Sequence, residues 1–147
     1  MSQVVTANLT QEQDFRFAIA FADGMPPIYG DEPPPLGKAT GPSPSQLLAA
    51  AVGNCLSNSL LFALRKFKQS PEPIQTAVVA TIDRNAENRL RVMNINVKLT
   101  LGVPAESLAH LDRALGQFEE FCTVSQSVRQ GIPITVEVYD SGGRRLK

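Results

Sequence analysis

A long apolar run that begins at Ser43 constrains the fold of this chain more than any other feature. Ser43-Pro44-Ser45-Gln46 carries three helix-start signals: a serine N-cap, a proline at the first helical position and a glutamine placed to complete a capping box. These signals predict a helix from Ser43 to about Lys66. Because apolar side chains surround nearly the whole circumference, we expect this helix to be central and buried.

Alternating apolar and polar residues predict the strands that cover this helix. The pattern indicates a strand over residues 15–21, a shorter partner around residues 4–9, a hairpin of residues 75–83 and 90–101, and a last strand over residues 132–138. The apolar parity changes between Val92 and Met93, which indicates either a bulge or two covered faces there. Residues 24–42 contain six prolines and four glycines, which favours a stiff extended loop without regular structure.

Two further helices complete the predicted order of elements. An amphipathic stripe that begins after Pro104 predicts a second helix ending at Cys122, and a repeated capping pattern predicts a short helix from Thr123 to Gly131. The length of 147 residues suits one domain, residues 1–147. We therefore expect a single α+β domain with helices packed on mostly antiparallel sheets.

Composition excludes several classes of partner. The chain has 14 basic and 14 acidic residues, so it has no net field that would attract nucleic acid or an anionic membrane. Polar residues interrupt the apolar run from Leu47 to Leu64, which makes a membrane span costly. One histidine and two distant cysteines form no zinc-binding spacing. The amino terminus lacks the pattern of a secretory signal, so we expect a reducing cytoplasmic location without a permanent disulfide.

The two cysteines are the strongest candidates for chemistry. Cys55 and Cys122 are 67 residues apart, and each lies on the predicted inward stripe of its own helix. A single buried cysteine usually acts as a small apolar side chain. If the two meet, one thiolate can attack a peroxide and form a sulfenic acid that condenses with the second thiol. The face of the first helix that centres on Cys55 contains Leu48, Ala51, Val52, Asn58, Ser59 and Phe62.

The sequence leaves the activation of either thiol open. Cys55 lies twelve residues beyond Ser43, too far from that end of its helix for the helix dipole to lower its pKa. Another cation or hydrogen-bond donor must therefore act on it. Cys122 precedes a predicted helix start, which would lower its pKa, but the carboxylates of Glu119 and Glu120 would raise it if they lie close.

Both cysteine segments resemble those of the OsmC/Ohr family of thiol-dependent peroxidases. The segment GPSPSQLLAAAVGNCLSNSL is similar to the family's N-P-E-x-L-(x)-A-A-x-x-x-C-x helix, and EEFCTVSQSV resembles its C-P-V-S motif, with Thr123 where proline is usual. The resemblance covers nearly the whole chain. It implies an intertwined homodimer with two long central helices, in which the sheet of each subunit wraps the other and the active sites lie at the interface.

The resemblance also implies specific roles. Cys55 would be the peroxidatic thiol and Cys122 the resolving thiol, organic hydroperoxides the substrates, and a dithiol such as a lipoylated protein the reductant. No metal, haem or flavin is implied.

The sequence departs from the family at the residues that support the thiol. Ser45, with Gln46 beside it, stands where the family has a glutamate, and only Lys38 or Arg16 could replace the family's arginine. Without that role, Arg16 and Lys38 are solvated charges and Gln46 is a capping partner. We therefore expect weak activation of Cys55. The alternative to a peroxidase is a small-molecule binding or redox-sensing protein of the same fold with weak or no peroxidase activity.

Overall fold

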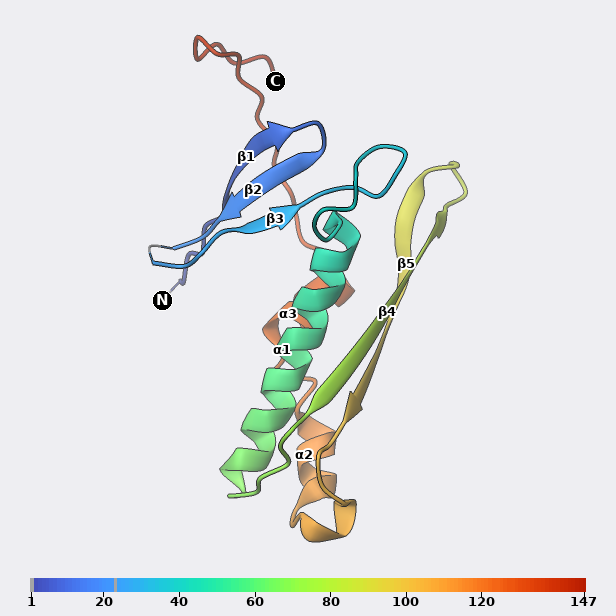
Figure 1. The fold of residues 1–147 in the computed structure, drawn as a ribbon. Coiled ribbons are helices and arrows are strands. Elements are labelled where there is room, and N and C mark those ends of the chain that lie inside the picture. The colour runs from blue at the N-terminus through green and yellow to red at the C-terminus, as the bar shows by residue number, and fades with distance from the viewer. Residues whose placement is uncertain (1, 23) are drawn as a thin grey trace.

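The computed structural model describes residues 2–22 and 24–147, which form one long helix, two antiparallel sheets and two short helices (Figure 1). The α+β class and the antiparallel sheets agree with the sequence prediction. The elements in chain order are β1 (Asn8–Gln13), β2 (Arg16–Ala20), β3 (Ile28–Gly30), α1 (Pro44–Lys66), β4 (Gln75–Arg84), β5 (Leu90–Thr100), the 3₁₀ turn η1 (Ala105–Ser107), α2 (Leu111–Gln117) and α3 (Thr123–Gln130).

Helix α1 begins and ends where the sequence predicts. The Ser43 hydroxyl accepts a hydrogen bond from the Gln46 backbone N–H at 3.2 Å, and the Gln46 side chain accepts one from the Ser43 N–H at 2.9 Å. This capping box satisfies two backbone donors that the start of a helix otherwise leaves without partners. At the other end, the basic residues Arg65 and Lys66 lie in the last turn, where they complement the helix dipole.

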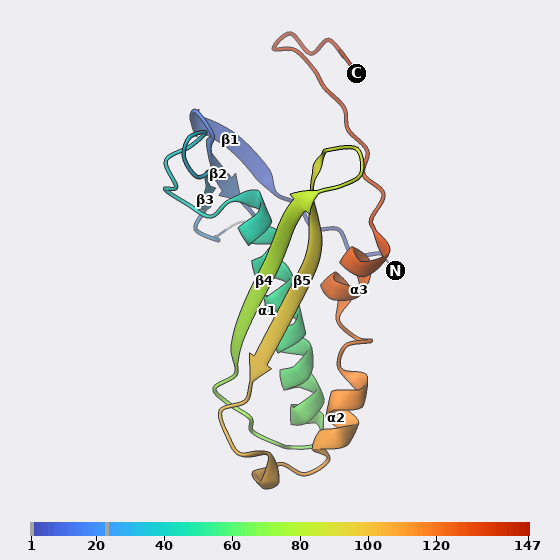
Figure 2. The ribbon, with the colours of Figure 1, turned by 90° about the vertical axis from the view of Figure 1, so that its right-hand side faces the viewer.

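The hairpin of β4 and β5 covers one side of α1, and α2 and α3 cover another (Figure 2). Gly53 makes the close approach of β4 possible, because a Cβ atom at this position would lie 2.5 Å from Val78 Cγ2. The hairpin is confirmed, and of the two alternatives for its parity change the structure has the bulge: Thr81 pairs with Asn94 and Ile82 with Val92, which leaves Met93 as the extra residue.

The core lies along α1 in two clusters. The first joins Val52 and Leu56 of α1 to Cys122, and the second joins Leu60 and Leu64 to Ala114 of α2. The expectation that α1 is buried on all sides is wrong for the single chain, because only two of its sides are covered. The Phe62 side chain is 67% exposed on the open side, together with Ala51, Asn54 and Asn58.

A buried aspartate organises the proline-rich loop before α1. Asp31 is 4% exposed and accepts hydrogen bonds from the N–H groups of Glu32, Lys38 and Thr40 and from the Thr40 hydroxyl. Donation by the Thr40 backbone and then its hydroxyl lowers the pKa of Asp31 to about 2. The expectation of no regular structure here is wrong for three residues, because β3 pairs with β2.

Three other predictions need correction. The strand expected around residues 4–9 begins later, as β1, because its partner β2 pairs with residues 8–13. The helix expected from Pro104 to Cys122 is broken: His110 has a left-handed backbone with φ 58°, and only residues 111–117 form regular helix before α3. The strand expected over residues 132–138 has no neighbouring strand among the described residues, so its apolar side chains are exposed; Val138 alone is paired, with Leu146 and Lys147 beside the bridge of Tyr139 to Arg145.

We expect Gly53→Ala to lower the free energy of unfolding by about 1–3 kcal/mol, because its methyl group would push β4 away from α1. Urea denaturation measures the change. Gly116→Ala in α2 is the matched control, since a Cβ atom there meets nothing within 4 Å and alanine favours helix. Equal stability of the Gly53→Ala variant and the wild type would show that α1 and β4 do not pack this closely.

Candidate functional site

The fold brings the two cysteines together. Cys55 lies in the middle of α1, and Cys122 is the N-cap residue of α3. Cys55 packs against the cluster formed by Val52, Leu56 and Cys122, and both thiols are free. Cys122 has no exposed surface, whereas Cys55 is partly exposed. One thiol is therefore accessible to a substrate, and the other is not.

Cys55 is the less acidic thiol of the pair. Burial raises its pKa, the Cys122 sulfur adds to this increase, and the backbone N–H groups of Val124 and Thr123 act in the opposite direction. These two N–H groups belong to the first turn of α3, where no helix partner accepts from them. Cys55 is too far from the start of α1 to receive a hydrogen bond from its N–H groups, and the start of α3 supplies these donors instead.

Cys122 is the more acidic thiol. Burial alone raises its pKa, but hydrogen bonds from the Ser125 hydroxyl, the Cys55 thiol, the Ser125 N–H and the Ser59 hydroxyl lower it below the ordinary value. The sequence leaves open whether the start of a helix or the carboxylates of Glu119 and Glu120 determine the pKa of Cys122. In the structure, the hydrogen-bond donors determine it. The donors around Cys122 therefore favour its charged form, whereas burial disfavours the charged form of Cys55.

Cys55 opens onto an apolar cavity of about 380 Å³ between α1 and the segment that joins α2 to α3. Four phenylalanines form much of its wall, and Lys66 contributes a positive charge at the far end of the same helix. The full lining is Cys55, Asn58, Ser59, Phe62, Ala63, Lys66, Phe67, Gln117, Phe118, Phe121 and Thr123.

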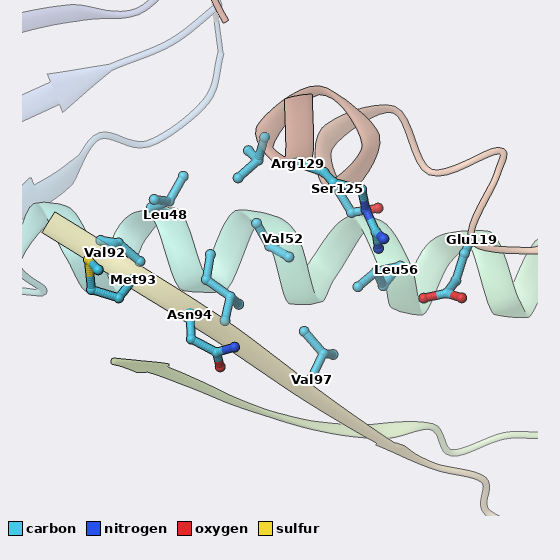
Figure 3. Close-up of a pocket in the computed structure, with 12 residues that line it drawn as sticks. Leu48, Val52, Leu56, Val92, Met93, Asn94, Val97, Glu119, Ser125 and Arg129 are labelled. Carbon is cyan, nitrogen blue, oxygen red and sulfur yellow. The ribbon is translucent and has the colours of Figure 1, made fainter. Parts of the chain in front are cut away.

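A second cavity, of about 660 Å³, lies between α1, β5 and α3 (Figure 3). Val52 and Leu56 form part of its wall, and Glu119 and Arg129 supply its charged side chains. Neither cysteine lines it, although Ser125 does. The cavity of Cys55 is therefore the candidate site for a reaction at sulfur.

The four predicted supporting residues lie away from this site. Arg16 forms an ion pair with Glu12 at 2.8 Å, and its Nη1 donates to the Thr40 hydroxyl at 2.9 Å. Lys38 is exposed in the same loop. Ser45 and Gln46 line a different cavity, beside β4. None of these four residues lines the cavity of Cys55 in the described part of the chain.

The structure adds residues that the sequence reasoning did not assign to the site. The sequence predicts Ser59 on the Cys55 face but gives its hydroxyl no role. It predicts Ser125 only as part of the capping pattern that begins at Thr123, and Lys66 only as the end of the helix. The available signal was helical spacing, because Ser59 and Lys66 follow Cys55 by four and eleven residues. Among the described residues, no three histidine, cysteine or acidic side chains group closely enough to hold a metal ion.

The profile of the OsmC-like protein family matches residues 37–137. A putative osmotic stress induced and detoxification response protein from Psychrobacter arcticus 273-4 has a similar structure, with TM-score 0.69, 20% identity and coverage of 86% of this chain and 89% of that chain. The organic hydroperoxide resistance protein of Bacillus subtilis is similar with TM-score 0.59, 17% identity and coverage of 90% and 96%. No protein of curated function matches the sequence. At these identities the similar structures establish the fold.

We expect Ser125→Ala to raise the pKa of Cys122, since it removes the donor that lowers this pKa most. Thiolate ultraviolet absorbance against pH, recorded in a Cys55→Ser background, reports Cys122 alone. Ser127→Ala removes a hydroxyl from the same helix that does not act on either thiol, and should leave the titration unchanged. Identical titrations for the two variants would contradict the assignment of Ser125.

Proposed function

The chain belongs to the OsmC-like protein family, and from this membership we propose that it is a thiol-dependent peroxidase that reduces organic hydroperoxides with Cys55 and Cys122. The observation that carries the proposal is the contact between an accessible thiol that lines an apolar cavity and a fully buried, more acidic thiol. Two of the similar structures, from Bacillus subtilis and Elizabethkingia anophelis, are described as organic hydroperoxide resistance proteins.

The proposed reaction has three steps. The Cys55 sulfur attacks the terminal oxygen of the hydroperoxide, the O–O bond breaks, and the alkoxide leaves and takes up a proton as the alcohol. The Cys122 thiolate then attacks the sulfur of the Cys55 sulfenic acid, a disulfide forms, and the departing hydroxide takes up a proton from solvent and leaves as water. An external dithiol, of the lipoyl type, supplies two electrons and two protons and restores both thiols. No bound metal or organic cofactor takes part in this proposed reaction. We propose that it takes place in a reducing cytoplasm.

The activation of Cys55 comes from the start of α3 in this proposal. The Cys55 proton passes to the departing alkoxide as the O–O bond breaks, because an alkoxide is a far stronger base than a Cys122 thiolate that donors already stabilise. The N–H groups of Thr123 and Val124 then stabilise the charge on the Cys55 sulfur. This supports weaker activation than a cation would give, since Ser45 stands in place of the family glutamate and Arg16 is bound to Glu12 and Thr40.

We further propose an intertwined homodimer with the two sites at its interface. The single chain exposes 11,368 Å², whereas a compact protein of its mass exposes roughly 7,400 Å². Helix α1 is long and apolar enough to cross a membrane by length and composition, but its polar Asn54 and Asn58 favour a protein neighbour on the open side. The α1 helices of two copies would supply the two long central helices, and residues 132–137, which pair with no described strand, would join the sheet of the partner.

One observation favours the alternative function, a binding or redox-sensing protein with weak or no peroxidase activity. The pKa of Cys55 is raised, and the one cation that lines its cavity, within the described chain, is Lys66, three helical turns away. A thiol of this kind reacts slowly unless its proton is removed during the attack.

We expect wild-type protein to consume cumene hydroperoxide with dihydrolipoamide as reductant, and Cys55→Ser to lose this activity by about a hundredfold or more. Cys122→Ser should stop after one turnover with Cys55 as a sulfenic acid, which dimedone traps for mass spectrometry. Ser127→Ala serves as the control and should keep full activity. Equal rates in the wild type and Cys55→Ser would sink the peroxidase, and thiols that stay reduced under mild peroxide would support the binding protein.

The proposed dimer should appear in light scattering as twice the chain mass of 15.9 kDa. We expect Phe62→Glu to shift the protein toward the single-chain mass, because it would place a charge on the open side of α1. Leu36→Glu is the matched control, since Leu36 is about as exposed as Phe62 but lies in the proline-rich loop. A wild-type mass of 15.9 kDa would refute the dimer.

A further inference from the structure

Ser59 carries the one hydroxyl, among the described residues, that both lines the cavity of Cys55 and donates a hydrogen bond to the Cys122 sulfur. It follows Cys55 by four residues, so it lies one turn further along the same face of α1. The other hydroxyl that acts on Cys122 belongs to Ser125, which lines the second cavity instead. Ser59 therefore connects the buried thiol with the place where a substrate would react.

The position of Ser59 on α1 agrees with these two contacts. At about 100° per residue, Ser59 lies roughly 40° around the helix from Cys55, in the direction of Val52 and Leu56. Those two residues pack against Cys122, and Ser59 itself is half-buried. Its hydroxyl thus lies between the two thiols and the core, and not on the open side of α1 where we propose the partner copy.

The second step of the proposed reaction needs a proton at the leaving oxygen. When the Cys122 sulfur attacks the Cys55 sulfenic acid, the S–O bond breaks and negative charge moves from Cys122 to the departing oxygen. Hydroxide is a strong base and a poor leaving group, so the step is fast only if a positioned group protonates the oxygen as the bond breaks. Because Cys55 lines the cavity, the oxygen departs into the space that Ser59 also lines.

We propose that Ser59 is a catalytic residue of this second step, which holds the Cys122 thiolate and then gives its hydroxyl proton to the hydroxide that leaves Cys55. As the S–S bond forms, the Cys122 sulfur loses its charge and the departing oxygen gains it, so the Ser59 proton moves to the oxygen and water leaves. Ser59 regains a proton from solvent through the cavity, so the solvent proton reaches the hydroxide by way of Ser59. This inference rests on the proposed peroxidase function and adds a residue to it.

Single-turnover kinetics with cumene hydroperoxide separate the two steps, because dimedone trapping and mass spectrometry follow the formation and the loss of the Cys55 sulfenic acid. We expect Ser59→Ala to form the sulfenic acid at close to the wild-type rate, and to form the disulfide about ten- to a hundredfold more slowly. Ser59→Thr keeps a hydroxyl and should restore most of the rate. Ser57→Ala is the matched control, since the Ser57 hydroxyl of the same helix donates to the Gly53 carbonyl at 2.7 Å, and both steps should stay unchanged.

A second leaving group tests the proton transfer itself. Methyl methanethiosulfonate converts the accessible Cys55 thiol to a methyl disulfide and releases methanesulfinate, and Cys122 then displaces methanethiolate, a much weaker base than hydroxide. We expect Ser59→Ala to slow this displacement by about threefold or less, because only the hydrogen bond to Cys122 is lost. An equal loss of rate with both leaving groups would show that Ser59 only holds Cys122, and would overturn its role as a proton donor.

The outcomes separate this inference from the peroxidase proposal. If the sulfenic acid forms normally, and is lost at the same rate in the wild type and Ser59→Ala, the role of Ser59 is overturned and the peroxidase stands. If cumene hydroperoxide produces no sulfenic acid in the wild type, the peroxidase is overturned and the role of Ser59 with it. The methyl disulfide identifies this second case, since Cys122 still resolves it.

Discussion

The packing of α1 against the start of α3 is the contact on which the rest of the structure depends. Val52 and Leu56 bury their side chains against Cys122 in this contact, which fixes where α3 begins. The first N–H groups of α3 then face Cys55, one turn from the same apolar residues. Gly53 makes the arrangement possible, because β4 approaches α1 closely on one side and leaves another side to α3. The packing of the core therefore also brings the two thiols into contact.

The elements that the sequence predicted well are those with local signals. The capping box at Ser43 and Gln46 depends on residues three positions apart, and the bulge at Met93 is visible as a change of parity in one strand. The failures depend on distant residues. The break before α2 is held by a hydrogen bond from the Ala109 N–H to the Gln69 side chain, forty positions away. Residues 132–138 have a strand pattern but no strand beside them in the part of the chain that the structure describes, and no local signal says where a partner lies.

The same distinction applies to the site. Helical spacing alone placed Ser59 on the Cys55 face, and the inward stripes made contact of the cysteines a reasonable expectation. Motif position placed Ser45 and Gln46 near the site, but ten residues of helix separate Ser45 from Cys55, about 15 Å. Arg16 was a candidate by charge only. Its partners Glu12 and Thr40, and through Thr40 the buried Asp31, show that it organises the proline-rich loop.

The difference between the two thiols suits the proposed reaction better than two equally acidic thiols would. A thiolate becomes less nucleophilic as its pKa falls, so a Cys55 sulfur with a raised pKa attacks more strongly once its proton has left. Donors already favour the charged form of Cys122, so its thiolate is a weak base and stays charged for the later attack on the oxidised Cys55 sulfur. Its burial keeps peroxide away from it until Cys55 has been oxidised. The acidic thiol, Cys122, is thus shielded from peroxide, and the more nucleophilic Cys55 is exposed to it. Cys55 therefore reacts first with the peroxide, and Cys122 reacts second with the oxidised Cys55.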